Sequence, residues 1–411
     1  MNRENNLYNV IIVGGGFSGL ITAIKLKQKN NSLKVCIIEK LDRVGKKILS
    51  TGNGQCNLSN TQASDFNNYH GLNPVYYSKI LEKYGTKEII NFFNSLGILT
   101  CVQGEKVYPL SMQASSILDA LRFAVNDLNI EVFTSCIVTG INRANNYKVT
   151  INSNGIERIL TSNNVVIATG GKASSHLGSN GEGYQLLENL SHKTTSLYPA
   201  ISQLKTDNIK GLKGLKQKAK VYAYSSNKLL SQTEGDIMFT DYGVSGNTIF
   251  YLSTYLANKQ NSKIVVDFCP NITTQGLFEF LQTKIINNGY LKIEYLLLGL
   301  LHNKLAEKII RSQVKETNNK TIKALTESEL KNIVNNVKNY TLNILGNMSF
   351  TNAQVTLGGA KVEEFDSLTM ESKINKGLYA VGEVLDITGN CGGFNLHWAF
   401  ASAMACSQNI N

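Results

Sequence analysis

The chain has 411 residues, of which 42% are apolar, and it carries a formal net charge of +11. The length exceeds that of one ordinary domain, so two or three domains are expected, and the apolar content predicts globular units with buried cores. The basic residues are spread along the chain without an arginine-rich tract or a basic stripe interleaved with aromatic residues, which disfavours nucleic acid as a partner.

The seven cysteines predict a reduced protein. Their number is odd and no two form a Cys-x-x-Cys pair, which argues against a disulfide framework, a structural zinc site or a redox dithiol. A reducing cytoplasm fits this pattern best. The apolar run near the N-terminus lacks the flanks of a signal peptide, and the apolar stretch 295–301 is shorter than the ~20 residues of a membrane-spanning helix. We therefore expect a soluble cytoplasmic protein without a membrane partner.

Residues 10–38 predict a strand, a helix and a second strand. Residues 10–13 are consecutive apolar residues, the pattern of a strand buried on both faces of a parallel sheet. A glycine-rich turn over 14–19 leads into a helix with apolar residues at helical spacing, and residues 34–38 form the second strand of a βαβ unit. Segment 45–57 is too rich in glycine to be regular, and we expect a loop whose backbone approaches a ligand closely.

The segments up to residue 171 alternate between helices and strands. Amphipathic helices are expected at 75–97 and 112–128, and short strands at 130–141 and 147–151. A further strand begins at residue 164 and ends in a glycine turn.

From about residue 192 the pattern changes to half-exposed strands. Over 216–223, lysines alternate with mostly small or apolar residues, which indicates a strand with a solvated lysine face, and similar strands up to residue 268 predict a small β subdomain. Helices follow over 275–313, and a polar, Asn- and Lys-rich stretch carries the chain to about residue 345. These helices carry one apolar stripe, formed by Ile293, Leu296, Leu297, Leu300, Leu305 and Ile309.

Gly14, Gly16 and Gly19 form a Gly-x-Gly-x-x-Gly motif in the turn of the βαβ unit. In this motif the first glycine permits the tight turn, the second lets phosphates approach the backbone, and the third lets the helix pack on the strand. The helix N-terminus faces the negative charge. Glu39 ends the second strand, where its carboxylate can accept a hydrogen bond from a ribose hydroxyl. A dinucleotide with a free 2′-hydroxyl is implied, which disfavours NADP at this site.

The C-terminal segment indicates that this dinucleotide is FAD. Residues 379–383 form a strand that closes on Gly382 and Glu383, which suits the ribityl and pyrophosphate part of a flavin nucleotide. Residues 392–396 then open an apolar helix. Reduced flavin carries negative charge around N1 and the C2 carbonyl, and free N–H groups at a helix start stabilise such charge. The alternative is a C-terminal helix that only docks on the sheet.

The motifs at the two ends of the chain predict one discontinuous nucleotide domain of the α/β class. Residues 1–190 and 346–411 would form the FAD-binding domain. Residues 191–272 would form an inserted β subdomain, and residues 273–345 a helical subdomain.

Over nearly its whole length the chain resembles the BaiN/YhiN-like family of FAD-dependent oxidoreductases, which includes aminoacetone oxidase-like flavoproteins. The stretches that carry the resemblance are 45–57, 107–116, 167–174 and 369–399. The resemblance implies a Rossmann-like FAD-binding domain with an inserted β-barrel-like subdomain and a helical subdomain. It also implies that Val138 contacts the adenine, that residues 169–171 contact the phosphate region, and that residues 51–57 contact the flavin.

The motifs and the resemblance together predict a set of cofactor-binding residues and no metal ligand. The set consists of Gly14, Gly16, Phe17, Ser18, Gly19, Glu39, Lys40, Lys46, Thr51, Gly52, Asn53, Gly54, Asn57, Val138, Thr169, Gly170, Gly171, Gly382, Glu383, Gly393, Phe394, Asn395 and Leu396.

Two residues depart from the family pattern, and the catalytic groups stay open. Gln55 stands where the glycine-rich loop usually carries an arginine, and Asp241 stands where a histidine is usual. Substrate specificity and catalytic detail are therefore not carried over from the family. His397 and His176 are candidates for a catalytic acid or base, although a structural role is the preferred interpretation. Cys56 either contacts the substrate or is a small buried filler, the preferred interpretation, and Tyr184 packs or lines the site.

The function expected first is a cytoplasmic FAD-dependent oxidoreductase acting on a small or medium organic substrate. By the resemblance, it either reduces a conjugated carbon–carbon double bond with NAD(P)H or oxidises a small amine such as aminoacetone with oxygen. No second dinucleotide motif is present, so NAD(P)H would dock in the substrate cleft. A flavin-dependent RNA-modifying enzyme and a non-catalytic FAD-binding module are further alternatives, and the sequence leaves the substrate and the oligomeric state open.

Overall fold

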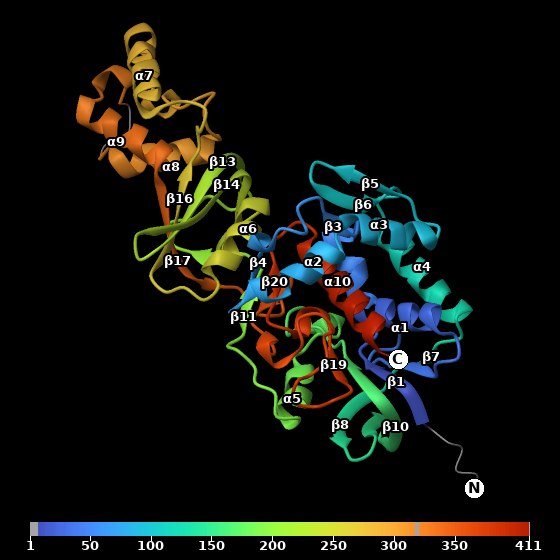
Figure 1. The fold of residues 1–411 in the computed structure, drawn as a ribbon. Coiled ribbons are helices and arrows are strands. Elements are labelled where there is room, and N and C mark those ends of the chain that lie inside the picture. The colour runs from blue at the N-terminus through green and yellow to red at the C-terminus, as the bar shows by residue number, and fades with distance from the viewer. Residues whose placement is uncertain (1–6, 316, 318–319, 411) are drawn as a thin grey trace. The chain divides into compact units, whose positions relative to one another are not determined.

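The structure is a computed structural model that describes residues 7–315, 317 and 320–410. The chain divides into two compact units, one formed by Met1–Pro199 with Phe350–Asn411 and the other by Ala200–Ser349 (Figure 1). Both ends of the chain therefore belong to the same unit. The second unit holds both the strands and the helices that the sequence analysis assigned to separate subdomains.

The first unit is built on a mixed sheet. In spatial order its strands are β7 (Glu131–Phe133), β2 (Val35–Ile38), β1 (Leu7–Val13), β10 (Ile156–Ile167), β9 (Tyr147–Ser153) and β8 (Ile137–Arg143). β7, β2, β1 and β10 run parallel, whereas β9 and β8 pair antiparallel. β19 (Leu378–Ala380) also pairs in parallel with β10, which adds the C-terminal segment to the sheet. The sheet confirms the predicted βαβ unit.

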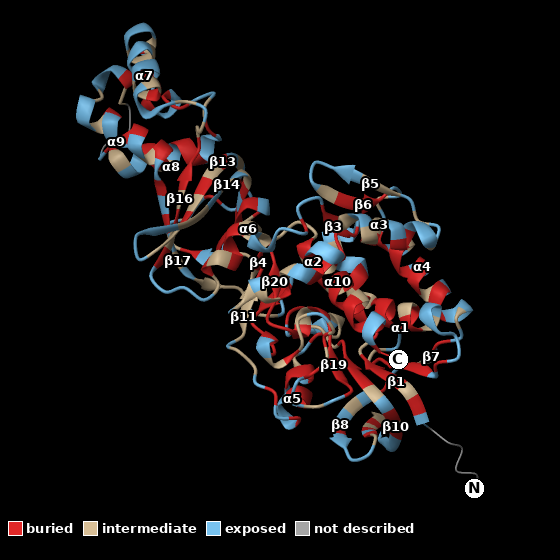
Figure 2. Cartoon of the chain, viewed as in Figure 1, coloured by how far each residue is buried: buried red, intermediate tan, exposed pale blue. Residues whose placement is uncertain are grey.

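Helix α1 (Phe17–Lys29) packs on this sheet, and α4 (Ala114–Asp127) and α10 (Phe394–Asn409) pack on α1. α1 contacts β1 and β2, and it also contacts α10 and α4. Because α1 has neighbours on several sides, almost all of its residues from Phe17 to Ile24 are buried, as the red helix ribbon in Figure 2 shows. This packing places the last helix of the chain directly against the first.

Smaller elements complete the first unit. The short strands are β3 (Ser59–Asn60), β4 (Tyr69–His70), β5 (Thr100–Gln103), β6 (Lys106–Pro109), β18 (Val355–Leu357) and β20 (Thr388–Gly389), with β11 (Tyr198–Ala200) at the limit of the unit. The further helices are α2 (Ser78–Lys83), α3 (Thr86–Ser95) and α5 (Glu182–Asn189). The 3-10 helices are η1 (Lys46–Gly54), η2 (Phe66–Asn68), η3 (Pro74–Tyr77), η4 (Ser175–Leu177), η7 (Val362–Glu364) and η8 (Gly382–Val384).

The helix expected over 75–97 is wrong as one element. The structure has η3, α2 and α3 there, and the break between α2 and α3 falls at Tyr84 and Gly85. The backbone of Gly85 is extended, and a Cβ atom there would lie 2.9 Å from Ser64 Oγ. The extended backbone of Gly85 therefore separates α2 from α3, which begins at Thr86. The helix expected over 112–128 is confirmed as α4.

The second unit is a closed barrel with helices attached. Its strands, in order around the barrel, are β12 (Leu204–Thr206), β15 (Gly243–Ser245), β14 (Lys228–Phe239), β13 (Lys216–Ser225), β16 (Ser262–Asp267) and β17 (Tyr340–Asn347). The predicted alternation is confirmed on β13, where Lys216 and Lys218 are exposed and Ala219, Val221 and Ala223 are buried. The helical elements are α6 (Asn247–Leu256), α7 (Thr274–Asn288), η5 (Ile293–Tyr295), α8 (Asn303–Gln313), η6 (Ile322–Ala324) and α9 (Glu327–Lys338).

The organisation of the chain after residue 290 differs from what the sequence predicts. The apolar stripe does not lie on one helix, because turns around Gly299, which has a φ angle of +84°, separate η5 from α8. Most of its members nevertheless share one core, with Leu300 only partly buried. The polar stretch before residue 345 contains α9 and closes the barrel with β17. In the described part of the chain, no helix combines the length and the hydropathy that crossing a bilayer requires.

Candidate functional site

The three motif glycines are needed for different physical reasons. Gly14 has a φ angle of +107°, and a Cβ atom there would collide with the carbonyl oxygen of Ala168. A Cβ atom at Gly19 would collide with the carbonyl oxygen of Gly14, so both residues are fixed by packing. A Cβ atom at Gly16, in contrast, would meet nothing within 4 Å. Gly16 immediately precedes α1, and the N-terminus of this helix has no side-chain cap. The open space at Gly16 therefore lies in front of free helix amides, an arrangement that suits a pyrophosphate.

Glu39 holds the glycine turn at the end of β2. Its Oε2 accepts a hydrogen bond from the Gly15 amide at 2.9 Å, and its Oε1 accepts one from the Leu41 amide at 2.8 Å. A carboxylate offers about four lone-pair positions, so capacity for a ribose hydroxyl is left. The Cys136 amide donates to the Glu39 carbonyl oxygen at 3.0 Å, which brings the start of β8, with the half-buried Val138, next to this acid.

The glycine-rich segment after β2 is a kinked 3-10 helix where a loop was expected. η1 is interrupted at Thr51, Gly52 and Asn53, whose backbone is not helical. Gly52, Asn53 and Gly54 have φ angles of +57°, +54° and +85°, so this stretch depends on residues that tolerate the left-handed region. The Gly45 amide donates to the Gly15 carbonyl oxygen at 2.8 Å and anchors the segment on the glycine turn.

The two motif regions from opposite ends of the chain are in contact. A Cβ atom at Gly382 would lie 2.8 Å from Ser18 Oγ in the first turn of α1. The Gly382 amide donates to Ser402 Oγ at 2.9 Å, and Trp398 Nε1 donates to the Gly382 carbonyl oxygen at 3.0 Å. α10 therefore fixes the C-terminal glycine against the N-terminal helix.

The N-terminus of α10 is a second uncapped helix start. Its N-cap residue, Gly393, has a φ angle of +100° and no side-chain cap. A Cβ atom at Gly393 would lie 2.7 Å from Asn57 Oδ1. Asn57 Oδ1 is buried and has no hydrogen-bond partner among the described residues. An orphaned acceptor beside free helix amides suits the polar edge of a flavin ring, which carries both an N–H group and carbonyl oxygens.

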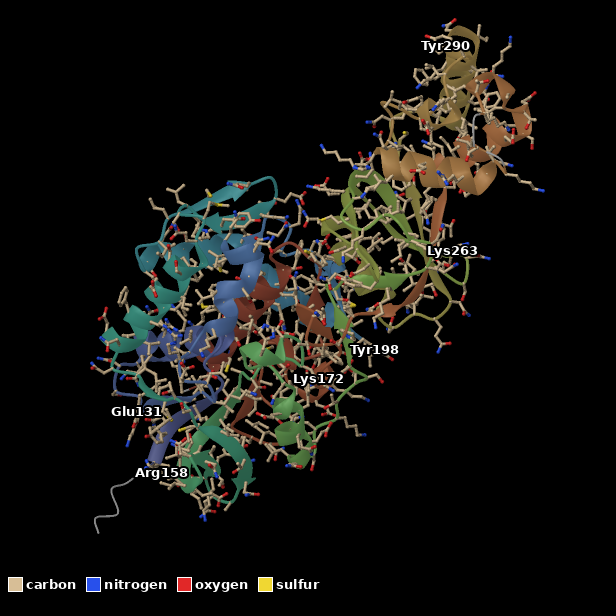
Figure 3. All side chains as sticks on the ribbon, turned by 180° about the vertical axis from the view of Figure 1, so that it is seen from behind. Glu131, Arg158, Lys172, Tyr198, Lys263 and Tyr290 are labelled. Atoms are coloured by element: carbon tan, nitrogen blue, oxygen red, sulfur yellow. The ribbon has the colours of Figure 1, made fainter. Side chains whose placement is uncertain are left out.

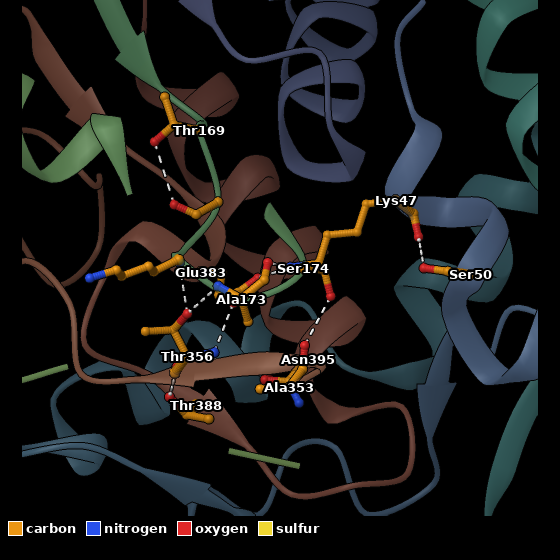
Figure 4. Close-up of polar contacts among 12 residues, drawn as sticks. Lys47, Ser50, Thr169, Ala173, Ser174, Ala353, Thr356, Glu383, Thr388 and Asn395 are labelled. Atoms are coloured by element: carbon orange, nitrogen blue, oxygen red, sulfur yellow. Dashed lines mark hydrogen bonds and ion pairs between the residues drawn. The ribbon is translucent and has the colours of Figure 1, made fainter. Parts of the chain in front are cut away.

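Glu383 is held by contacts within the chain. Its Oε2 lies 2.8 Å from Lys47 Nζ, and its Oε1 accepts from the Thr356 amide at 3.0 Å (Figure 4). Thr356 Oγ1 accepts in turn from the amides of Lys172 and Ala173, at 2.8 and 3.0 Å. Lys47 and Thr356 were missed by the sequence analysis. Lys47 lies within the glycine-rich segment and could have been found there, whereas Thr356 stands in no motif.

The same region contains the second glycine turn, after β10. Gly170 has a φ angle of +71°, and a Cβ atom at Gly171 would lie 2.6 Å from Glu383 Oε1. Thr169 lies against α5, because a Cβ atom at Gly183 would collide with Thr169 Oγ1. Three backbone segments therefore converge around Glu383.

Several predicted site residues have their side chains occupied elsewhere. Lys40 pairs with Glu182 at 3.1 Å and Lys46 pairs with Asp42. The ring of Phe17 is buried against Phe93, and that of Phe394 against Tyr69. The side-chain amide of Asn395 binds both backbone groups of Gly389. Thr51 Oγ1 donates to the Ile48 carbonyl oxygen, and Leu396 is half-buried. For the residues at the two helix starts, any contact with a cofactor would run through the backbone.

The titratable candidates near α10 are shielded. Burial lowers the pKa of His397 to about 4, and its Nδ1 lies 2.9 Å from Ser59 Oγ. Burial raises the pKa of the Cys56 thiol to about 12. Burial also raises the pKa of Tyr184, whereas His176 is an exposed residue of η4. None of these four has the features of a proton donor that faces a substrate.

The two residues that depart from the family pattern are exposed. Gln55 lies at the end of η1. Asp241 belongs to the second unit and pairs with Lys213 at 2.9 Å.

Comparison with known proteins gives one family and several full-length relatives. Residues 8–409 match the model of the HI0933-like protein Rossmann domain. The chain is 33% identical over 398 residues to a 3-dehydro-bile acid delta(4,6)-reductase of Clostridium scindens, covering 95% of this chain and 96% of that protein. It is 26% identical over 419 residues to a ribosomal RNA dihydrouridine synthase of Haemophilus influenzae, covering 98% of each.

Two solved structures share the fold at low identity. The Escherichia coli quinol fumarate reductase chain aligns with a TM-score of 0.52 and 15% identity, covering 98% of this chain and 70% of that chain. The 3-ketosteroid delta1-dehydrogenase of Sterolibacterium denitrificans aligns with a TM-score of 0.50 and 12% identity, covering 99% of each.

Proposed function

The chain belongs to the HI0933-like Rossmann-domain family, and we propose that this FAD-dependent oxidoreductase reduces a carbon–carbon double bond conjugated to a carbonyl group. The substrate is a small or medium organic molecule, and NAD(P)H is the reductant. When bound, FAD supplies the two-electron chemistry, while the protein supplies orientation and electrostatics.

The observation that carries this proposal is the pair of uncapped helix starts in one unit. Free amides before α1 at Gly16 suit a pyrophosphate, and free amides before α10 at Gly393 suit the negative charge of a reduced flavin. The contact between Gly382 and Ser18 keeps the two helices together. A site that stabilises the anionic reduced cofactor suits an enzyme in which the flavin takes up electrons and then passes them to an acceptor.

The name of the Clostridium scindens relative supports the choice of substrate. That protein is a reductase of double bonds in a 3-dehydro bile acid, and the match covers nearly all of both chains. A double bond next to a ketone accepts a hydride readily, because the carbonyl group takes up the electrons. We therefore place conjugated ketones first among the substrates.

Anaerobic mixing with NADH and with NADPH tests the proposal. We expect one of them to bleach the yellow flavin, and addition of a steroid enone such as testosterone to restore the colour. A flavin that neither nicotinamide bleaches would contradict the reductase. Hydrogen peroxide release from aminoacetone in air would instead identify an amine oxidase.

A second candidate function, reduction of uridine in RNA, is favoured by the charge distribution. Residues 200–349 contain 19 Lys and Arg against 11 Asp and Glu, so this unit carries +8 of the net +11. The uridine ring also holds a double bond conjugated to a carbonyl, and the Haemophilus influenzae relative is named a dihydrouridine synthase. The second unit would supply the attraction for the RNA backbone.

Aromatic and basic side chains lie together on β13 and β16 of the barrel, which was not expected from the sequence. Lys220 lies over the ring of Tyr222, 5.5 Å from its centroid, and Lys263 lies 5.9 Å from the ring centroid of Tyr224. Figure 3 labels Lys263 on β16. Tyrosines among lysines are a surface on which single-stranded bases can stack.

RNA binding separates the two candidates. Under the RNA hypothesis, the protein retains ribosomal RNA at low salt and releases it at high salt. When the reduced enzyme is added, the RNA gains the mass of two hydrogens per modified uridine. The double variant Lys220→Glu with Lys263→Glu should weaken retention and leave testosterone reduction unchanged. Absence of retention at low salt rules the RNA hypothesis out.

A further inference from the structure

One tyrosine stands between the segments that we assign to the flavin side of the site. Tyr108 lies on β6, which pairs with β3 directly after the glycine-rich segment, and the Leu58 amide donates to the Val107 carbonyl oxygen at 2.8 Å. The Tyr108 ring carbon Cε1 lies 3.7 Å from the Cβ position of Gly52. Its ring therefore packs against the left-handed part of η1.

The same strand is tied to the start of α10. Asn60 Nδ2, on β3, donates to the Gly392 carbonyl oxygen at 3.0 Å, immediately before the uncapped helix start. The carbonyl oxygen of Ser59 lies against the position of a Cβ atom at Gly393. Tyr108 therefore lies in a sheet whose edge strand, β3, contacts the residues at the start of α10.

The Tyr108 hydroxyl group is uncommitted. Tyr108 is 9% exposed, yet its Oη neither donates to nor accepts from another described residue, and it is not among the polar atoms sealed from solvent. Its small exposed area therefore includes the hydroxyl group. Burial raises the pKa of the phenol, with a smaller contribution from the neighbouring Cys391 and Cys101, so the proton is retained at neutral pH.

Three other protic side chains of this region already have partners within the chain. Thr51 Oγ1 donates to the Ile48 carbonyl oxygen at 2.6 Å, and Ser59 Oγ binds His397. His70 Nε2 binds Asn390 Oδ1 at 2.7 Å. The half-buried thiol of Cys391 is the competitor to Tyr108, and burial raises its pKa also.

We propose that Tyr108 is the catalytic acid that delivers the proton to the α carbon of the substrate double bond. This assignment rests on the proposed function. In the net reaction NAD(P)H is oxidised to NAD(P)+ as its C–H bond breaks, and the double bond is reduced. A hydride adds at the β carbon, and the π electrons of the double bond move to the α carbon. There a C–H bond forms as the O–H bond of Tyr108 breaks, and the phenolate regains its proton from water.

Lys106 can stabilise the phenolate that this step leaves. It lies two residues before Tyr108 on the same strand, so both side chains leave the same face of β6. Its Cε lies 3.9 Å from the Cβ position of Gly392, next to the start of α10. A positive charge on this side of the site favours the deprotonated phenol.

The variant Tyr108→Phe tests the assignment, since it removes only the hydroxyl group. We expect the bound flavin to be reduced by NAD(P)H at the wild-type rate, within about 2-fold. Reoxidation by testosterone or cyclohexenone should slow by about 10²-fold, a typical contribution of a general acid. The Kd of either ketone for the oxidised protein, read from the shift of the flavin spectrum, should change by less than about 3-fold, because protonation occurs after binding.

Two matched variants and the wild type make the result decisive. Tyr84→Phe removes another tyrosine hydroxyl, one that is buried without a partner, and it should keep both rates. Cys391→Ala should also keep both. Any of three results would overturn the assignment. The flavin of Tyr108→Phe could be reoxidised at the wild-type rate, that of Cys391→Ala could fail to be reoxidised, or Tyr108→Phe could lose ketone binding. Failure of the wild type itself to reduce any ketone would instead overturn the proposed function.

Discussion

At the level of single residues, glycines of one motif perform separable tasks. Gly14 and Gly19 are required because a side chain would collide with backbone oxygens inside the fold. Gly16 has no such neighbour, so only a ligand can require a glycine there. The motif predicts a separate role for each glycine, and the structure gives the physical reason at Gly14 and Gly19 and shows open space at Gly16.

We expect Gly16→Ala to fold normally and to lose FAD. The methyl group enters open space in the apoprotein, so its Tm should match that of the wild type, whereas FAD affinity should fall by about 10-fold or more because the pyrophosphate is displaced. Thermal unfolding of the apoprotein and FAD titration measure the two effects. Gly14→Ala is the control and should lower the Tm. Wild-type FAD affinity in Gly16→Ala would show that no phosphate approaches this residue.

His397 makes the stability of the first unit depend on pH. Its folded-state pKa of about 4 lies below the unfolded value of about 6.5, so the unfolded chain binds the proton first as the pH falls. The contribution of neutral His397 to the free energy of unfolding is complete above pH ~6.5 and is lost towards pH ~4. Between pH 7 and pH 5 the free energy of unfolding should fall by about 2 kcal/mol through this group.

Urea unfolding at these two pH values checks this expectation. The single tryptophan of the chain, Trp398, is buried on the same helix and reports the transition. The loss of unfolding free energy between pH 7 and pH 5 should shrink in His397→Gln and persist in the exposed-site control His176→Gln. Equal losses in the wild type and His397→Gln would show that another group is responsible.

At the level of elements, the sequence predicts best where the pattern is local and strong. β1, α1, β2 and α10 follow from apolar runs and glycine turns, and the structure confirms them. The prediction fails where distant contacts decide the conformation. The hairpin of β5 and β6, which carries Tyr108, is stabilised by pairing with β3.

α9 is the clearest missed element, and its start explains why it forms. Thr326 and Glu329 make a capping box, in which the Glu329 amide donates to Thr326 Oγ1 at 3.2 Å and the Thr326 amide donates to Glu329 Oε2 at 2.8 Å. We expect Thr326→Ala to lower the unfolding free energy of the second unit by about 1 kcal/mol, measured by circular dichroism in urea. Thr321→Ala is the control, since Thr321 makes no side-chain cap. Equal stability of the two variants would contradict this role of the box.

At the level of the whole molecule, the sequence predicts the joining of the two chain ends but not the distribution of charge. Glycine motifs at both ends indicate one discontinuous domain, and the structure places both ends in the unit formed by Met1–Pro199 and Phe350–Asn411. Lysines occur along the whole sequence, but their excess over acidic residues differs between the two units. Residues 200–349 then hold most of the excess positive charge.

The central claim is that the helix starts of α1 and α10 bind a single FAD within the first unit. Titration of the apoprotein with FAD, followed by quenching of flavin fluorescence, tests this claim most directly. We predict saturation at one FAD per chain in the wild type and strongly weakened binding in Gly16→Ala. A chain that stays colourless and leaves flavin fluorescence unchanged at saturating FAD would contradict it.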